Sequence, residues 1–317
     1  MAGGFKDGRV LLSQSVVILK RYPKFMAPLL LAWLVYAPLI IYLRFFFPWS
    51  QYERYAQFII LFLAFAVMST VIGISCLVLL EMFHQVESGL PIKLGLAFVH
   101  TLDDDLPRAL PILLVWALLW FALTLIQVFT RRKRAGDSTT EFSPENAARV
   151  LVGYRSQFSF SDAFFEAMKK GVRMVVFLIL PAIAWEHLWP IDATRRGLHV
   201  LKAHLSVFAS GFVLTEAASL LIFLPAFVII YTSAKARVTL PPEVWFGVII
   251  YSSFAWSFTF FIEQMFAAQL YLWHLKWLDA CKDASNSKSP LPSLENVKKP
   301  TILDDVPEFV KLGMVEE

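Results

Sequence analysis

The sequence has little charge and almost no cysteine. Only 17% of its 317 residues are charged, whereas soluble domains carry about 25%. The two cysteines, Cys76 and Cys281, lie in an apolar run and in the polar C-terminal part. Neither has the paired spacing of a zinc site, and two residues do not make the disulfide framework of a small secreted domain. The composition therefore excludes a disulfide-rich module and argues against a soluble one.

Sequence motifs of the common enzyme classes are also missing. There is no HExxH, no GxSxG, no glycine-rich phosphate loop and no Cys/His nucleophile pair. His199 and His204 are five residues apart, a spacing that does not place two metal ligands on one helix face. We therefore expect no enzyme, no catalytic residue, no metal and no cofactor. A catalytic cluster would have to come from Glu186 and His187 together with His204.

Apolar residues are abundant instead. They make up 57% of the chain, with 29 Phe and 10 Trp, and the mean hydropathy is +0.60. Trp favours the bilayer interface, where its ring and its N–H are both satisfied. The net charge of +4 and the pI near 9.0 fit the basic cytoplasmic loops of a membrane protein. No nucleic-acid readout motif accompanies this charge, so nucleic acid is not an expected partner.

Long apolar runs predict an all-α integral membrane protein with about six transmembrane helices. A bilayer core needs roughly 20 apolar residues per helix. Three runs contain no charge, two contain a single acid, and the fourth in order is short and holds Pro181. The expected membrane domain covers residues 25–276, with spans near 25–43, 58–80, 109–130, 174–191, 205–232 and 244–268.

Amphipathic segments precede several of these runs and predict interfacial elbow helices. Such helices lie in the interface plane, with basic residues toward anionic headgroups. They are expected at 1–24, 91–108, 161–173 and 191–204. The similarity of Ile18-Leu19-Lys20 to Val200-Leu201-Lys202 hints at an internal repeat. Residues 277–317 form a polar tail that we expect to be flexible, although a short apolar pattern near its end leaves docking open.

The distribution of Lys and Arg leaves the topology of the middle pair of spans open. Basic residues are retained on the cytoplasmic side, yet six crossings spread them almost evenly, because many lie between residues 131 and 173. A re-entrant pair at 109–130 and 174–191 would put nearly all of them on one side. Since 109–130 is a full-length uncharged run, we favour six crossings with both termini in the cytoplasm.

Glu216 is the most informative polar side chain, since it lies near the middle of the fifth run. An ionised acid there costs a few kcal/mol unless it is paired or hydrated. On the same helix Gly211, Thr215 and Ser219 recur every four residues, a small-residue face that permits close helix packing. The acid is either a proton or cation site or a structural hydrogen-bonding group between helices.

Two further groups of polar residues are candidates. Glu263 and Gln264 lie in the last third of the sixth run, beside a stripe of Ser and Thr that faces either the bundle interior or an aqueous path. Glu186, His187, Arg195 and Arg196 follow the fourth run near an interface. They either bind an anionic headgroup or a partner, or anchor the helix end.

Two stretches resemble an uncharacterised family of bacterial multi-pass membrane proteins, a domain of unknown function. The first is Gly8-Arg9 followed by Ser15 to Lys24, and the second runs from Leu180-Pro181 through Trp185-Glu186 and Trp189-Pro190-Ile191 to Arg195-Arg196-Gly197. The family usually has glycine where Trp189 stands. The resemblance implies a bacterial inner-membrane protein with elbow helices and makes Pro181, Glu186 and Arg196 motif positions. It implies no activity.

The function expected from the sequence is that of a non-enzymatic membrane component. Its partners would be a bilayer with anionic headgroups and other membrane-protein subunits, contacted through helix packing. The alternative is a small permease or an ion or proton channel that uses Glu216 and Glu263. The two differ in one respect: a permease needs Glu216 in a hydrated cavity, whereas a scaffold needs it sealed between helices.

Overall fold

The computed structural model describes residues 2–135, 160–236, 241–293, 296–300 and 308–312. Among these residues every regular element is a helix, and none is a strand. Five of the described stretches are long and apolar enough to cross a bilayer: Pro23–Ile41, Arg54–Glu87, Leu94–Thr130, Leu205–Ser233 and Pro242–Asn286. A helix satisfies all its backbone N–H and C=O groups internally, as a lipid environment requires. The expected all-α membrane fold is confirmed.

Across the described chain the helices follow one another as three units, each with an elbow helix, an outgoing helical segment and a returning helix. The first unit contains α1 (Ala2–Arg21), η1 (Pro23–Met26), α2 (Ala27–Leu31), α3 (Trp33–Ile41), the π-helix η2 (Tyr42–Phe46), η3 (Trp49–Gln51) and α4 (Arg54–Glu87). The second contains α5 (Leu94–His100), the π-helix η4 (Thr101–Asp105), α6 (Leu106–Ala135) and α8 (Phe160–Ala184). The third contains α9 (Pro190–Ala203), α10 (Leu205–Ala236) and α11 (Pro242–Asn286).

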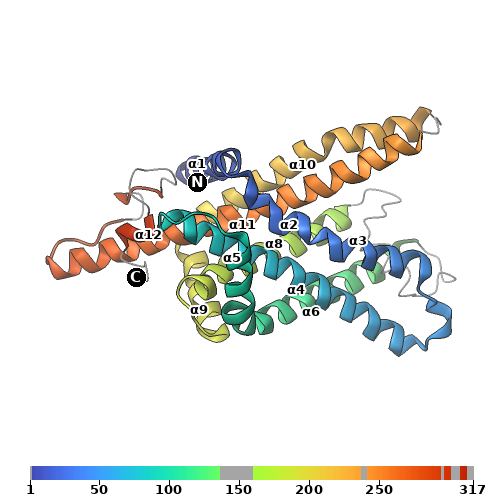
Figure 1. Ribbon diagram of the computed structural model, residues 1–317, viewed down its shortest axis with the longest axis horizontal. Helices are drawn as coiled ribbons and strands as arrows, with labels where there is room; N and C mark the ends of the chain where they lie inside the picture. Colours follow the sequence, from blue (N-terminus) through green and yellow to red (C-terminus); the bar gives the residue numbers. More distant parts are fainter. Residues whose placement is uncertain (1, 136–159, 237–240, 294–295, 301–307, 313–317) are drawn as a thin grey trace.

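Each elbow helix packs against the unit before it. Helix α5 contacts α4, α9 contacts α8, and α1 closes the series by packing on α10 and α11. Helices α1, α5 and α9 gather at one end of the bundle, which we call the elbow end (Figure 1). The similar triplets Ile18-Leu19-Lys20 and Val200-Leu201-Lys202 both lie on elbow helices. The hint of a repeat in the sequence thus coincides with a repeated order of elements.

Helix α8 differs from what the sequence predicts. The segment 174–191 was expected to be a span and 161–173 an interfacial helix, but both belong largely to one helix, Phe160–Ala184. This helix packs inside the bundle against α6, α9 and α11. It is absent from the five strongly apolar stretches because its first half is charged. The amphipathic pattern was misread because its polar face meets other helices rather than headgroups.

The first span is interrupted rather than continuous. Between Pro23 and Ile41 the chain passes through η1, α2 and α3, and Pro28 and Pro38 each lack a backbone N–H for the helix. The Tyr36 hydroxyl donates a hydrogen bond to the Met68 carbonyl of α4. The ring of Tyr36 also packs edge-on against Trp256 of α11, with centroids 5.4 Å apart. These contacts fix the broken segment to the returning helices.

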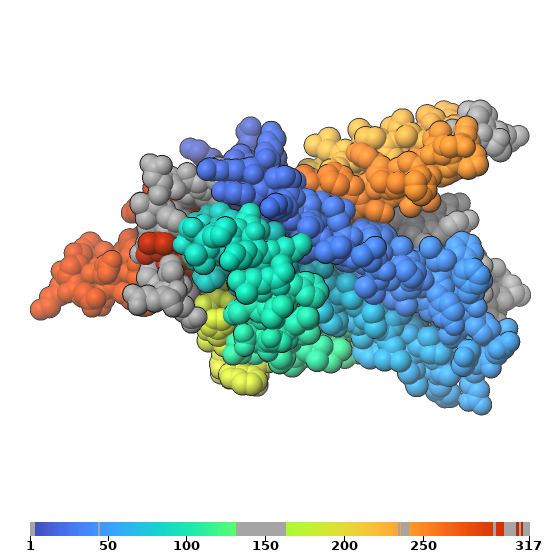
Figure 2. Space-filling view, in the orientation of Figure 1, coloured from blue at the N-terminus to red at the C-terminus, as the bar shows by residue number. Residues whose placement is uncertain are grey.

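The returning helices α4, α8 and α11 form the core, and the core lies toward the elbow end. Their buried residues concentrate in the C-terminal halves of α4 and α8 and in the middle of α11, between Ala255 and Leu275. Phe83 of α4 stacks on Trp185, which follows α8, with ring centroids 5.6 Å apart. At the opposite end α10 and α11 diverge from α3 and α4 (Figures 1 and 2), and their side chains there are mostly exposed. The bundle is therefore compact at one end and splayed at the other.

The described part of the tail is docked, whereas the sequence led us to expect flexibility over 277–317. Residues 277–286 continue α11, and the Trp273 indole N–H donates a hydrogen bond to the Val297 carbonyl at 3.1 Å. In α12 (Glu308–Lys311) Phe309 is fully buried against the rings of Phe83, His84 and Trp185. Helices α1 and α12 lie at the same end of the bundle (Figure 1).

Candidate functional site

Three cations in the first half of α8 define the candidate site. Lys169, Lys170 and Arg173 are spaced so that they project from neighbouring turns of one helix. Lys170 and Arg173 meet acids on two other helices, Glu216 of α10 and Glu263 of α11. Opposite charges at this depth are expected to pair, because an isolated ion inside a membrane protein is costly. Tertiary packing thus brings together the two acids singled out from the sequence.

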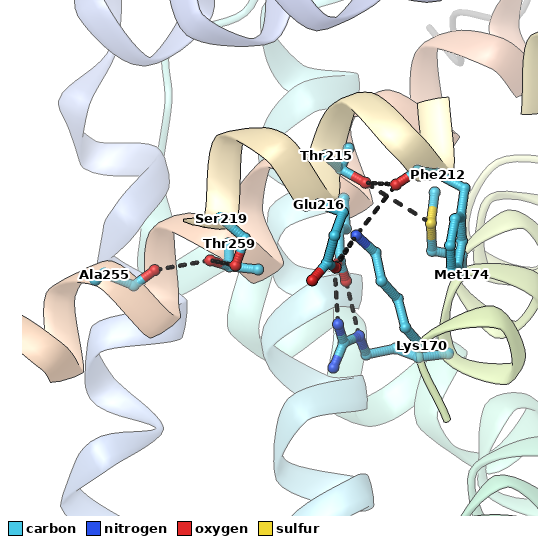
Figure 3. A network of polar contacts seen from close by, with 10 residues as sticks. Lys170, Met174, Phe212, Thr215, Glu216, Ser219, Ala255 and Thr259 are labelled. Atoms are coloured by element: carbon cyan, nitrogen blue, oxygen red, sulfur yellow. Dashed lines mark hydrogen bonds and ion pairs between the residues drawn. The ribbon is translucent and has the colours of Figure 1, made fainter. Parts of the chain in front are cut away.

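Lys170 is the centre of the network. Its ammonium group donates to Glu216 Oε2 at 2.8 Å and to the Phe212 carbonyl at 3.2 Å, and lies 3.6 Å from Glu263 Oε1. Figure 3 shows the ammonium pointing at the Glu216 carboxylate. The Lys170 side chain is only 6% exposed, whereas that of Glu216 is 52% exposed. One ammonium group therefore has three acceptors, and of the two carboxylates among them only that of Glu216 is exposed.

Arg173 and Glu263 form the closed part of the network. The guanidinium donates through Nε and Nη2 to both carboxylate oxygens, at 2.7 and 2.8 Å. It also lies over the Phe260 ring, 4.4 Å from the centroid. Glu263 is fully buried. A two-point pair with this geometry is short and strongly directional, so both oxygens of Glu263 are satisfied within the protein.

A cavity of about 580 Å³ lies beside this network, between α6, α8, α10 and α11. Glu216, Lys170 and Arg173 line it, together with a second pair, Glu166 and Lys169, whose atoms are 2.8 Å apart. Its walls include six aromatic residues, Trp116, Trp120, Phe212, Phe223, Trp256 and Phe260. We call this the charged cavity. Its size is within the usual range for small-molecule sites, roughly 300–1,000 Å³.

The other candidates on the two spans surround the charged cavity as helix-packing groups. The buried Thr215 hydroxyl donates a hydrogen bond to the Phe212 carbonyl at 3.1 Å. The hydroxyls of Ser219 and of Thr259 on α11 are hydrogen-bonded to each other at 3.1 Å (Figure 3). Gln264 donates to the Phe177 carbonyl at 3.3 Å. A methyl group on Gly211 would lie 2.0 Å from a ring atom of Phe266. The expected small-residue face is thus a close contact between α10 and α11.

The four interfacial candidates separate into three different contacts. Arg196 donates to both oxygens of Glu186, at 2.7 and 3.2 Å, and the Tyr271 hydroxyl donates to the same carboxylate. The hydrogen bond and charge of Glu186 raise the pKa of Arg196. His187, in a left-handed conformation with φ 51°, instead lies 3.3 Å from Arg108. Within the described part of the chain, the ion-pair partner of Arg195 is Asp192 on its own helix, at 3.4 Å.

Histidines form a separate pair at the elbow end. His204 Nε2 and His274 Nδ1 are 2.8 Å apart, and the His199 ring centroid is 5.6 Å from that of His274. Burial, with a smaller effect of His199, lowers the pKa of His204 to about 4. Within the described ranges no group of three or more His, Cys, Asp or Glu side chains is arranged to hold a metal. Glu186, His187 and His204 each contact a different partner, so they form no common cluster.

The cations of α8 are functional candidates that the sequence analysis missed. Lys169, Lys170 and Arg173 were assigned to an interfacial helix, where headgroups would neutralise them. Two lone acids in apolar spans require cationic partners, and these three cations lie on the segment that leads directly into the short, doubtful fourth run. The need of the two acids for cationic partners was therefore the signal in the sequence that could have identified these residues.

Comparison with family models, curated proteins and solved structures gives no match for this chain. The resemblance to the bacterial multi-pass family accordingly stays a prediction. Any assignment of function has to follow from the contacts around the charged cavity and at the elbow end.

Proposed function

We propose that this chain is a non-enzymatic membrane protein of the permease type, which binds a small solute with a cationic group in the charged cavity. The observation that carries the proposal is the environment of Glu216: its side chain is half exposed and lines the cavity, while its partner Lys170 is buried. A purely structural acid would be sealed, as Glu263 is. The alternative inferred from the sequence, a permease, therefore becomes the leading hypothesis.

The contacts of Lys170 allow Glu216 to exchange this lysine for a solute. If a solute takes the place of the Lys170 ammonium group at Glu216, that group still has two acceptors, Glu263 at 3.6 Å and the Phe212 carbonyl at 3.2 Å. Displacement from Glu216 therefore does not leave a buried cation without acceptors, which would otherwise be strongly unfavourable. Glu216 can release and regain this partner while the rest of the network stays paired.

The walls indicate which solutes fit. Glu166 and Glu216 are the more exposed members of their ion pairs, so carboxylates rather than ammonium groups are presented to the cavity. The rings of Trp116, Trp120 and Trp256 surround them, and aromatic faces attract organic cations. An amine or a zwitterion matches this combination better than a simple anion.

Cysteine accessibility tests the proposal directly. Ser219 lines the charged cavity, whereas Leu221, two residues further on α10, is 70% exposed and absent from the lining. In full-length protein with Cys76→Ala and Cys281→Ser, we would compare Ser219→Cys with Leu221→Cys in membranes. The probes are a membrane-impermeant trimethylammonium methanethiosulfonate and its sulfonate counterpart. Modification at 219 but not at 221, faster with the cationic reagent, is expected.

Glu216→Gln supplies the charge control in the Ser219→Cys background. Removal of the carboxylate charge should abolish the preference for the cationic reagent while leaving position 219 accessible. If neither reagent modifies position 219, water does not reach the charged cavity, and the permease proposal is wrong. Modification at 219 and 221 alike would mean that the bundle opens nonspecifically, which also contradicts it.

The second candidate function is a structural subunit of a membrane complex. It is favoured by the large exposed apolar surface of α10 and α11 at the splayed end, where Leu221, Phe227 and Phe246 are all more than half exposed. Lipid also covers such surfaces, so the labelling experiment decides between the two functions. A sealed Glu216 would leave the scaffold as the better account.

The proposed location is the bacterial inner membrane, with both termini in the cytoplasm. It is supported by the family resemblance and by α1 and α12 lying at one end of the bundle (Figure 1). Six helices that traverse the bundle return the chain to its starting side. Reporter fusions at each end that are active only in the periplasm should both be silent.

A further inference from the structure

A second cavity, distinct from the charged one, is a groove between α6 and α8. It measures about 620 Å³ and is closed at one end by the first turns of α9. Its walls come from Ile112, Val115 and Leu119 of α6 and from Val172, Val176 and Ile179 of α8. These residues recur at helical spacing, so the groove runs along both helices. We call it the α6/α8 groove.

The polar groups of the groove lie at the α9 end. Apart from the backbone, they are Thr194 and Arg195. The Arg195 side chain is 78% exposed, and its nearest partner is Asp192 at 3.4 Å on the same exposed helix face. An exposed pair of this kind contributes little stability, so the guanidinium remains available. Its neighbour Arg196, by contrast, is committed to Glu186.

We propose that the α6/α8 groove binds one anionic phospholipid, with an acyl chain along α6 and α8 and the headgroup phosphate on Arg195. The apolar walls suit a hydrocarbon chain, and a guanidinium offers paired donors to phosphate oxygens. Basic pockets between helices near an interface are a known mode of headgroup recognition. A free phosphate would leave the apolar walls unused, so the lipid accounts for both parts of the groove.

Trp116 relates this lipid site to the rest of the molecule. It lines both the α6/α8 groove and the charged cavity. Its ring stacks on Trp120 with centroids 5.9 Å apart and meets Phe177 edge-on at 6.1 Å. The acyl chain would therefore abut the wall of the charged cavity without entering it. The lipid site does not depend on the permease proposal.

Native mass spectrometry of the full chain, released from micelles with equal amounts of phosphatidylglycerol and phosphatidylcholine of identical chains, tests the headgroup contact. The wild type should retain one phosphatidylglycerol in preference to phosphatidylcholine. Arg195→Gln should remove this preference. Lys202→Gln, which removes an exposed cation from the same helix away from the groove, should keep it. Full preference in Arg195→Gln would overturn the proposal.

A matched pair on α6 tests the chain contact. Val115 lines the groove and is 57% exposed, whereas Leu118 is 54% exposed and does not line it. Val115→Trp fills the groove and should abolish retention of the lipid, while Leu118→Trp should not. Both positions face lipid, and equal melting temperatures would show that both variants fold. Retention of the lipid by Val115→Trp would overturn the proposal. A change in the oligomer mass of Val115→Trp, in place of lipid loss, would also overturn it and would assign the groove to another protein chain.

Discussion

Two regions of this molecule are built on the same chemical unit, a guanidinium held by both oxygens of a glutamate. In the middle of the bundle Arg173 binds Glu263 at 2.7 and 2.8 Å. At the elbow end Arg196 binds Glu186 at 2.7 and 3.2 Å. The elbow-end pair is completed by the Tyr271 hydroxyl. The central pair is instead extended by Lys170 to Glu216, which opens on the charged cavity.

The difference separates a structural ion pair from a potential binding site. Both arginine–glutamate pairs are satisfied within the protein, so neither has a reason to exchange its partner. Glu216 is different because it adds an exposed carboxylate to a network whose cation already has other acceptors. Space and a replaceable contact, rather than charge alone, are what make the central network suitable for a ligand.

The largest expected effect comes from removing the closed acid of the central network. Glu263→Gln leaves Arg173 and Lys170 without the carboxylate that they share. Breaking a buried pair on one side typically costs about 3–5 kcal/mol. We expect a loss of this order in the free energy of unfolding, measured by titrating micelle-solubilised protein with dodecyl sulfate.

Glu216→Gln is the matched comparison for that experiment. Because Glu216 is half exposed and Lys170 keeps two other acceptors, its loss should lower the free energy of unfolding by less than about 1 kcal/mol. Equal losses in the two variants would mean that the two acids have the same structural role, and the distinction between them would fail.

The elbow-end pair should respond less strongly than the central one. In Glu186→Gln the Arg196 guanidinium and the Tyr271 hydroxyl lose a charged acceptor, and each such hydrogen bond contributes roughly 1.5–3 kcal/mol. Since Arg196 is partly exposed, we expect a net loss of about 2 kcal/mol in the free energy of unfolding. Modification of Ser219→Cys in the charged cavity should stay unchanged. A change there would show that the two regions are coupled.

The sequence predicts the general plan of this fold because apolar runs and amphipathic lead-ins are local signals. The predicted elbow segments at 1–24, 91–108 and 191–204 correspond to α1, to α5 with η4, and to α9. The first half of α8 could not be placed in this way. Its cations look the same whether headgroups or buried acids neutralise them, and only tertiary packing decides. The same applies to the site, where Glu216 and Glu263 were found but their shared partner Lys170 was not.

Phe309 tests whether the elbow end is also closed by the tail. Phe309→Ala removes the ring that packs on Phe83, His84 and Trp185. Because α12 is a single turn near the end of the chain, its release should affect the tail far more than the bundle. We expect faster proteolysis and faster backbone hydrogen exchange within 296–300 and 308–312, with little change in the melting temperature. The exposed Val310→Ala is the control. Equal protection in both variants would show that Phe309 does not hold the tail.

The last expected effect is a pH dependence confined to the elbow end. His204 has a pKa of about 4 in the fold, against 6.5 for an unperturbed imidazole, because it is buried beside His274 and His199. Between these pH values the unfolded chain binds a proton that the folded chain does not, so the free energy of unfolding falls as the pH is lowered through that window. Above pH 6.5 the free energy of unfolding should not depend on the protonation of His204.

His204→Gln should flatten the fall in stability between pH 6.5 and 4, whereas His199→Gln, at an exposed position, should flatten it less. If the wild-type stability rose on acidification instead, a protonated His204 would be stabilised by the fold, and the view of the elbow end as a closed region would be wrong.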